Sequence, residues 1–333
     1  MTKEKYLVLK GCAGLGNRLM TICNALEYCK RTNRRLIIDW SDGVFAPKGL
    51  NVFLKYFRII DFASLSSLED VQEGMDGFSF YPPVFKKNIE SGGYDHFHHV
   101  TTTFFQKIPK RVLFNERLKM LHGFWQDKTR LTPTSAFGFF KEIFVFSNLP
   151  FGHDLSRNRT EDVLFYFDFT PNSLKETFLK HVVLQSDIDG RIASYASEHN
   201  LNRNTIGVHV RSTDKKPERS LAALYEKIKK LNLRDFQIFL ATDNKEVATA
   251  VKNMFPKVIE YPKFMPDIKS EGMHLWAKYN DQLQHGERIL EESIVDMWLL
   301  SKCEYLLFQG NSTFSILSSF MHPNRSKSID WDQ

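Results

Sequence analysis

Residues 206–216 contain an apolar run that stops abruptly in polar and charged side chains. Such a run is typical of a buried parallel strand, whose carboxyl end presents polar groups at the edge of the sheet. His209 and Arg211 stand two positions apart, so a regular strand would project both side chains from one face. A guanidinium beside an imidazole can hold an anion. The stretch therefore predicts a phosphate-bearing ligand, and the alternative is a strand that ends in solvated charges.

Strand-like and helix-like patterns alternate through the rest of the second half. Predicted strands cover 206–211, 236–241, 258–261 and 305–308, and a long helix covers 289–303 after a loop from 262 to about 288. This alternation indicates a parallel sheet with helices on both faces. Because the carboxyl ends of parallel strands share one edge, we expect polar residues from three of them to meet in one crevice. These residues are Arg211, Thr242, Asp243, Asn311, Ser312 and Thr313.

The first half opens with a βαβ pattern around a glycine-rich turn. A strand-like run at 6–9 precedes Gly11, Gly14 and Gly16, and a helical pattern then leads to a second strand at 36–39. Glycines at a helix start let backbone N–H groups approach an anionic or oxygen-rich ligand. Their spacing reverses the dinucleotide fingerprint, so a nicotinamide cofactor and a dehydrogenase are not expected.

Chain length and charge limit the remaining choices. With 333 residues the chain fits two domains, which we place at 1–180 and 181–333. The net charge of +6 is compatible with an anionic substrate or loose attachment to an anionic membrane face, and is too small to indicate nucleic-acid binding. No apolar segment approaches the roughly 20 residues needed to span a bilayer. The first residues do not form a signal peptide, so we predict a cytoplasmic protein, with peripheral attachment to the inner membrane face as an alternative.

Among three further isolated features, two leave alternative interpretations open. Four cysteines without a metal-site spacing predict reduced thiols and no metal ion. Trp125 and Gln126 could stack on a sugar ring and bond its hydroxyls, or belong to the core. Asp296 stands among apolar residues of the long helix, where its oxygens could accept the paired N–H donors of a guanine edge. Alternatively, Asp296 simply faces water.

Several segments resemble one enzyme family. Residues 206–215 resemble the first donor-binding motif of the α1,6-fucosyltransferases of the core N-glycan and nodulation-factor type, and 240–244 resemble their second. Residues 296–303, leading to 310–315, look like the third. Residues 14–19 and 123–126 are also similar to segments of the α1,2-fucosyltransferases. These motifs occur in matching order from the first loop to the last helix.

This resemblance implies a fold and a reaction. The fold would be α/β and GT-B-like, with two Rossmann-like domains facing a central cleft, the acceptor side in the first and the donor in the second. The reaction would be metal-independent, inverting transfer of fucose from GDP-fucose to a hydroxyl of an oligosaccharide or glycoconjugate. Arg211 would bind the β-phosphate and offset the charge that grows as GDP leaves. His209 and Asp296 would recognise the nucleoside, and Ser312 and Thr313 the phosphates.

The remaining roles follow from the same resemblance. Glu218 lies near the position of a candidate base, and Trp125 and Gln126 would face the acceptor. Ser212 stands where many relatives carry a second Arg, so the linkage formed is left open. The expected donor-binding residues are Gly14, Gly16, Asn17, His209, Asp214, Lys215, Thr242, Asp243, Asp296, Asn311, Ser312 and Thr313.

Two other functions fit the same pattern. One is a transferase that uses another nucleotide sugar, and the other is a non-catalytic carbohydrate-binding protein on the same fold. The acceptor itself is not identified by any motif between about 42 and 175.

Overall fold

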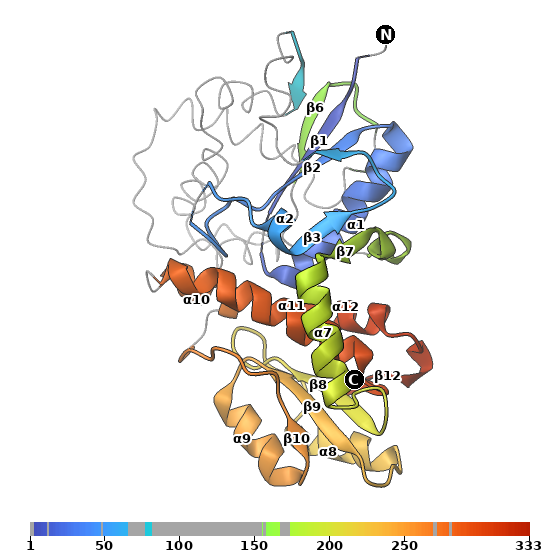
Figure 1. Ribbon diagram of the computed structural model, residues 1–333, viewed down its shortest axis with the longest axis vertical. Coiled ribbons are helices and arrows are strands. Elements are labelled where there is room, and N and C mark those ends of the chain that lie inside the picture. The colour runs from blue at the N-terminus through green and yellow to red at the C-terminus, as the bar shows by residue number, and fades with distance from the viewer. Residues whose placement is uncertain are drawn as a thin grey trace, which may run out of the picture.

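The computed structural model describes residues 3–11, 13–47, 49–65, 77–81, 155, 158–166, 174–268, 272–279 and 282–333. Figure 1 shows two groups of strands at opposite ends of the long axis, with α-helices between them. Trp125 and Gln126 lie outside the described residues.

The second sheet confirms the predicted parallel arrangement. Its five strands lie in the order β10-β9-β8-β11-β12, and every neighbouring pair is parallel. Strand order reverses between β8 and β11, because the chain proceeds from β8 toward β9 on one side and from β11 toward β12 on the other. The strands are β8 (Thr205–Val210), β9 (Gln237–Thr242), β10 (Val258–Ile259), β11 (Tyr305–Phe308) and β12 (Ser328–Asp330).

Alternate residues of β8 pack against different helices. Ile206, Val208 and Val210 join an apolar cluster with side chains of α8 (Leu221–Lys230) and α9 (Lys245–Met254). Gly207 faces the opposite way, where a Cβ would lie 3.0 Å from the Cys303 Sγ at the end of α11 (Gly286–Lys302). His209 stacks on Phe314 of α12 (Thr313–Met321). Both faces of the sheet are thus covered, as the alternation of strands and helices predicted.

The first sheet is also parallel in every pairing, with the order β4-β2-β1-β6-β5. The helix α1 (Leu15–Thr32) connects β1 to β2 and ends at Asn33, which adopts a left-handed conformation. The predicted βαβ unit is therefore confirmed. Its strands are β1 (Tyr6–Lys10), β2 (Arg35–Asp39), β4 (Ser64–Leu65), β5 (Phe80–Tyr81) and β6 (Val163–Tyr166).

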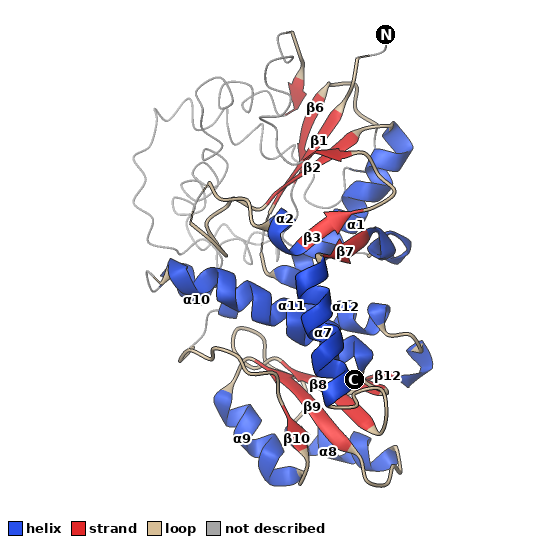
Figure 2. Cartoon of the chain, viewed as in Figure 1, coloured by secondary structure: helices blue, strands red, loops and turns tan. Residues whose placement is uncertain are grey.

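A short antiparallel pair joins the two halves. The helix α2 (Phe53–Tyr56) leads into β3 (Phe57–Ile59), which pairs with β7 (Val182–Leu184) after the 3-10 helix η4 (Glu176–His181). The helix α7 (Ser186–Glu198) then packs on α11, and Figure 2 shows both between the two groups of strands. The boundary near residue 180 remains a prediction.

Two parts of the second half differ from expectation. The predicted loop 262–288 contains α10 (Met273–Tyr279) and the 3-10 helix η5 (Leu283–His285), and α11 begins at Gly286 rather than Ile289. A further 3-10 helix, η6 (Arg325–Lys327), and β12 follow α12. Helical periodicity is recognised over windows of about 11–18 residues, and these elements are too short to show it. Among the described residues, no helix is long and apolar enough to cross a membrane.

Candidate functional site

The ends of β8 and β11 meet at the point where strand order reverses. The Arg211 backbone N–H, just after β8, donates to Gln309 Oε1, just after β11, over 2.8 Å. Gln309 Nε2 in turn donates to Asn311 Oδ1 over 2.8 Å. Open parallel sheets bind ligands in the crevice outside the carboxyl ends of such strands. The structure therefore brings Arg211 and Asn311 together, as the sequence predicted.

Asp214 holds the Arg211 guanidinium in a fixed orientation. Arg211 Nε donates to Asp214 Oδ1 and Nη2 to Asp214 Oδ2, both over 2.7 Å. Burial raises the pKa of the Asp214 carboxyl, but the adjacent Arg211 cation outweighs it and keeps that pKa below its usual value. A paired fork of this kind is rigid, so the guanidinium is oriented before any ligand binds.

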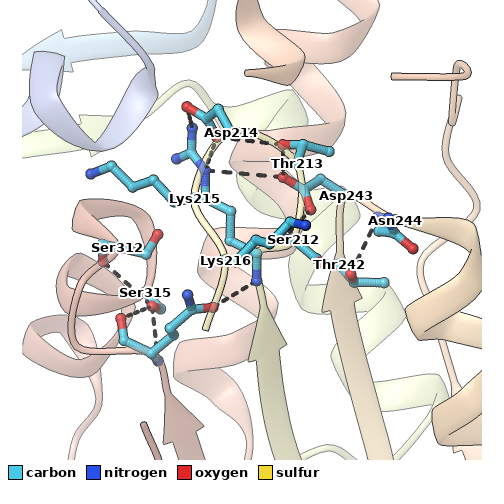
Figure 3. A network of polar contacts seen from close by, with 12 residues as sticks. Ser212, Thr213, Asp214, Lys215, Lys216, Thr242, Asp243, Asn244, Ser312 and Ser315 are labelled. Carbon is cyan, nitrogen blue, oxygen red and sulfur yellow. Dashed lines mark hydrogen bonds and ion pairs between the residues drawn. The ribbon is translucent and has the colours of Figure 1, made fainter. Parts of the chain in front are cut away.

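Asp243 organises the loop that carries Arg211. Its Oδ1 accepts from the Ser212 backbone N–H over 2.8 Å, and its Oδ2 accepts from Thr213 Oγ1 over 2.6 Å. Figure 3 shows Thr213 above the strand ends, facing Asp243, with Asp214 beside Thr213. Thr242 is buried and accepts from the Asn244 backbone N–H over 3.3 Å. Both residues stand at the predicted edge, and the contacts of Asp243 position the Arg211 loop. A direct contact of either residue with a ligand stays a prediction.

His209 and Asp296 form a second, more deeply buried group. His209 is 6% exposed and stacks on Phe314 at 5.0 Å. Burial, with Arg211 and Lys263 nearby, lowers the pKa of His209 to about 3, so the ring is neutral at pH 7. Asp296 is 5% exposed and bonded through Oδ2 to Lys263 Nζ over 2.5 Å. Burial raises the pKa of Asp296, and Lys263 opposes that rise. The alternative that Asp296 faces water is therefore wrong.

Three buried polar atoms have no hydrogen-bond partner among the described residues at this edge. They are His209 Nδ1 on β8, Asp296 Oδ1 on α11, and Ser312 Oγ just before α12. An unsatisfied buried polar group costs about 1–3 kcal/mol, so three from separate elements point to a polar ligand that satisfies them.

The start of α12 offers an anion site. Ser312 is fully buried and Thr313 begins the helix, whose first backbone N–H groups have no partner within the helix. Lys215 Nζ donates to the Asn311 backbone carbonyl over 3.3 Å, which brings an ammonium beside this helix start. Asn311 Nδ2 donates to the Lys216 carbonyl over 3.3 Å and ties the two loops together.

The glycine-rich loop of the first half reaches this helix start. A Cβ on Gly16 would lie 2.7 Å from the Phe314 backbone nitrogen, so α1 and α12 approach as closely as they do only because residue 16 is glycine. Gly14 precedes α1 and lies beside His274 of α10. Asn17 stands in the first turn of α1. Helix packing accounts for Gly16, and contact of Gly14, Gly16 and Asn17 with a donor stays a prediction.

Several residues near this site were not predicted. Lys263 and His274 both lie in the segment expected to be a loop, and Gln309 links the two strand ends. Lys263 follows β10 at the same sheet edge. The argument that polar residues after parallel strands share one edge, applied to this fourth strand, would have indicated Lys263. His274 had no such signal. Glu218 is exposed in the loop after β8, and its role as a base stays a prediction.

Comparison with known proteins was made at the level of sequence and of structure. No protein-family profile matches the sequence, and no curated protein is significantly similar to it. The crystal structure of fucosyltransferase NodZ from Bradyrhizobium is similar in structure, with a TM-score of 0.60 and 20% identity over 97% of this chain and 94% of that chain. NodZ α1,6-fucosyltransferase soaked with GDP-fucose gives a TM-score of 0.60 and 20% sequence identity, over 96% of this chain and 94% of that chain. NodZ α1,6-fucosyltransferase co-crystallized with GDP gives a TM-score of 0.58 and 20% sequence identity, over 97% of this chain and 94% of that chain.

The chain has the fold of these fucosyltransferases. The predicted α/β, GT-B-like architecture is thereby confirmed, with one parallel sheet in each half.

Proposed function

We propose that this protein transfers fucose from GDP-fucose to a hydroxyl of a glycan acceptor, without a metal ion and with inversion at the anomeric carbon. The observation that carries the proposal is a group of three buried polar atoms beside an oriented guanidinium at the strand-order reversal. These atoms, His209 Nδ1, Asp296 Oδ1 and Ser312 Oγ, have no hydrogen-bond partner within the part of the chain that the structure describes. Shared fold with a fucosyltransferase soaked with GDP-fucose supports the choice of donor.

The cations and the helix start suit a departing diphosphate. The acceptor oxygen would attack the anomeric carbon while the bond to the β-phosphate oxygen breaks and its electron pair leaves with GDP. Negative charge then grows on the diphosphate. Arg211, Lys215 and the first turn of α12 would stabilise it, and the Arg211 guanidinium does not have to reorient, because Asp214 already holds it.

The buried group suits the nucleoside. Asp296 remains a hydrogen-bond acceptor when ionised, and the ring of His209 is neutral and can accept or donate one hydrogen bond. The acceptor proton needs a destination, and Glu218, a carboxylate exposed in the Arg211 loop, is the group that we assign to that role.

Hydrolysis of the donor is the direct test. The protein is incubated with GDP-fucose, with a chelator and no acceptor, and GDP release is followed; calorimetry then compares GDP, UDP and ADP. We expect slow GDP release and preferential GDP binding. Unchanged GDP-fucose together with no GDP binding would contradict the proposal, whereas stronger binding of UDP or ADP would indicate another nucleotide sugar. Screening acceptors with labelled GDP-fucose, followed by linkage analysis, would identify the product.

A further inference from the structure

Lys263 is held firmly in place beside Asp296. Its side chain is 6% exposed and that of Asp296 is 7% exposed, with Nζ 2.5 Å from Oδ2. The residue that follows, Phe264, donates its backbone N–H to Glu292 Oε2 on α11 over 2.8 Å. Phe264 also stacks on His285 at 4.6 Å. These contacts fix the backbone next to Lys263, so its ammonium belongs to the buried site and is not a mobile surface charge.

The ion pair links three hydrogen-bonding groups one after another, and we call this series the row. Asp296 Oδ1 is a buried acceptor without a partner among the described residues. Asp296 Oδ2 is a second acceptor, and Lys263 Nζ, bonded to it, is a donor with further N–H groups. The order along the row is therefore acceptor, acceptor, donor.

We infer that Lys263 is a specificity-determining residue that donates to O6 of guanine while Asp296 accepts from the neighbouring N–H groups. This inference rests on the proposed use of a GDP-linked donor. The edge of guanine that pairs with cytosine presents an exocyclic amine, a ring N–H and O6, which is donor, donor, acceptor, and so complements the row group by group. Adenine presents an amine in place of O6, so the ammonium of Lys263 would face another donor. Its ring nitrogen carries no hydrogen, so the carboxylate of Asp296 would face another acceptor.

A change of one ligand atom tests the inference. In 6-thio-GDP a sulfur replaces O6, while both N–H donors remain. Sulfur is the weaker acceptor, so we expect the wild-type protein to bind GDP roughly tenfold more tightly than 6-thio-GDP, the difference expected of a hydrogen bond to a charged group. Calorimetry measures both affinities.

Lys263→Met then removes the donor and keeps the chain length. We expect this variant to lose roughly tenfold in GDP affinity and to bind GDP and 6-thio-GDP about equally. The reason is that the preference for GDP comes from the hydrogen bond between Lys263 and O6, which this variant cannot form. Lys263→Arg retains a donor and should keep a preference for GDP. Lys245→Met is the matched control, since Lys245 pairs with Asp267 at 2.8 Å on the surface; it should leave both affinities unchanged. Thermal unfolding checks that each variant is folded.

Two results would overturn the inference and leave the proposed function standing. The first is that the wild-type protein binds GDP well but binds 6-thio-GDP with the same affinity. This result does not depend on any variant being folded. The other is a folded Lys263→Met variant that keeps the wild-type preference. If the wild-type protein binds neither ligand and releases no GDP from GDP-fucose, the proposed function and the inference both fail.

Discussion

Arg211 makes its side-chain contacts through one edge of its planar guanidinium. Nε and Nη2 both bond Asp214, and Asp243 Oδ2 lies 4.0 Å from Nε. An ammonium could keep the positive charge at this position, but it could not reproduce the paired geometry. A single substitution that keeps the charge but not the paired geometry can therefore separate the contribution of orientation at residue 211 from the contribution of charge.

We expect Arg211→Lys to lower the rate of fucose transfer by about a hundredfold, the size of effect seen when one preorganised donor is lost from an active site. Release of GDP from GDP-fucose measures the rate, and the melting temperature should change little. Arg219→Lys is the control in the same loop, because Arg219 is exposed. Transfer by Arg211→Lys at the wild-type rate would show that charge alone is sufficient.

His209 links the site to acid stability. Its pKa falls from 6.5 to about 3 on folding, because burial disfavours the imidazolium. Below pH 6.5 the unfolded chain takes up a proton on this ring that the folded protein takes up only near pH 3. The free energy of unfolding therefore decreases as the pH falls through this window, by up to about 1.4 kcal/mol per pH unit.

Replacing His209 by Asn should remove this contribution. Between pH 7 and pH 5, the free energy of unfolding of the wild-type protein should fall by about 2 kcal/mol more than that of the variant, as measured by urea denaturation. His274, whose pKa burial also lowers to about 3, remains in both proteins and cancels in the comparison. Equal losses in the two proteins would show that His209 is not the group responsible.

At the scale of elements, the site depends on two helix starts that touch. The first turn of α1 carries Gly16, and the backbone of Thr313 and Phe314 at the start of α12 lies against it. Gly190 in α7 offers a contrast, since among the described residues no heavy atom would lie within 4 Å of its Cβ. One helical glycine is thus required by packing and the other is not.

Alanine at these two glycines should change stability in opposite directions. Gly16→Ala forces the backbones of α1 and α12 apart and should cost about 1–3 kcal/mol. Gly190→Ala should stabilise by about 0.5–1 kcal/mol, because alanine loses less backbone entropy in a helix. Urea denaturation measures both. A neutral Gly16→Ala variant would mean that the two helices can separate freely.

At the scale of the whole molecule, one apolar cluster connects the two sheets. It contains Leu7 and Leu36 of the first sheet together with Leu290 and Ile294 of α11 and Phe239 of the second sheet. Polar contacts reinforce the junction, since Tyr56 Oη donates to Glu287 and Glu291 of α11 over 3.1 and 3.2 Å. Lys55 pairs with Glu287, and Arg191 of α7 with Glu291. The two halves should therefore unfold together.

Calorimetry can test this cooperativity. We expect a single transition whose calorimetric and van't Hoff enthalpies agree. Tyr56→Phe removes the hydroxyl at the junction and should lower stability by about 1 kcal/mol while the single transition persists. Two separate transitions, with only one of them shifted by Tyr56→Phe, would show that the halves are independent.

Local patterns were enough to predict β1, β2, β8, β9, β10 and β11, most of the described α-helices and the residues at the strand ends, whereas β3 to β7 and β12 were not predicted. An apolar run followed by polar residues identifies a parallel strand and its carboxyl end wherever it occurs, because strand geometry repeats every two residues. Arg211, Asp243 and Asn311 were found in this way, and their convergence followed from the shared edge of a parallel sheet. The order of the motifs also predicted the fold that the structural comparison confirmed.

Only the tertiary structure decided which side chains pair. Asp296 could have faced water or a partner, and its partner is Lys263, 33 residues earlier on another element. Asp214 and Asp243 both follow strands, yet the first holds Arg211 and the second holds its loop. Gly16 looked like a ligand-binding glycine and proves to be needed where two helices meet. Such pairings depend on how elements pack over long sequence separations, and no repeating local pattern records that packing.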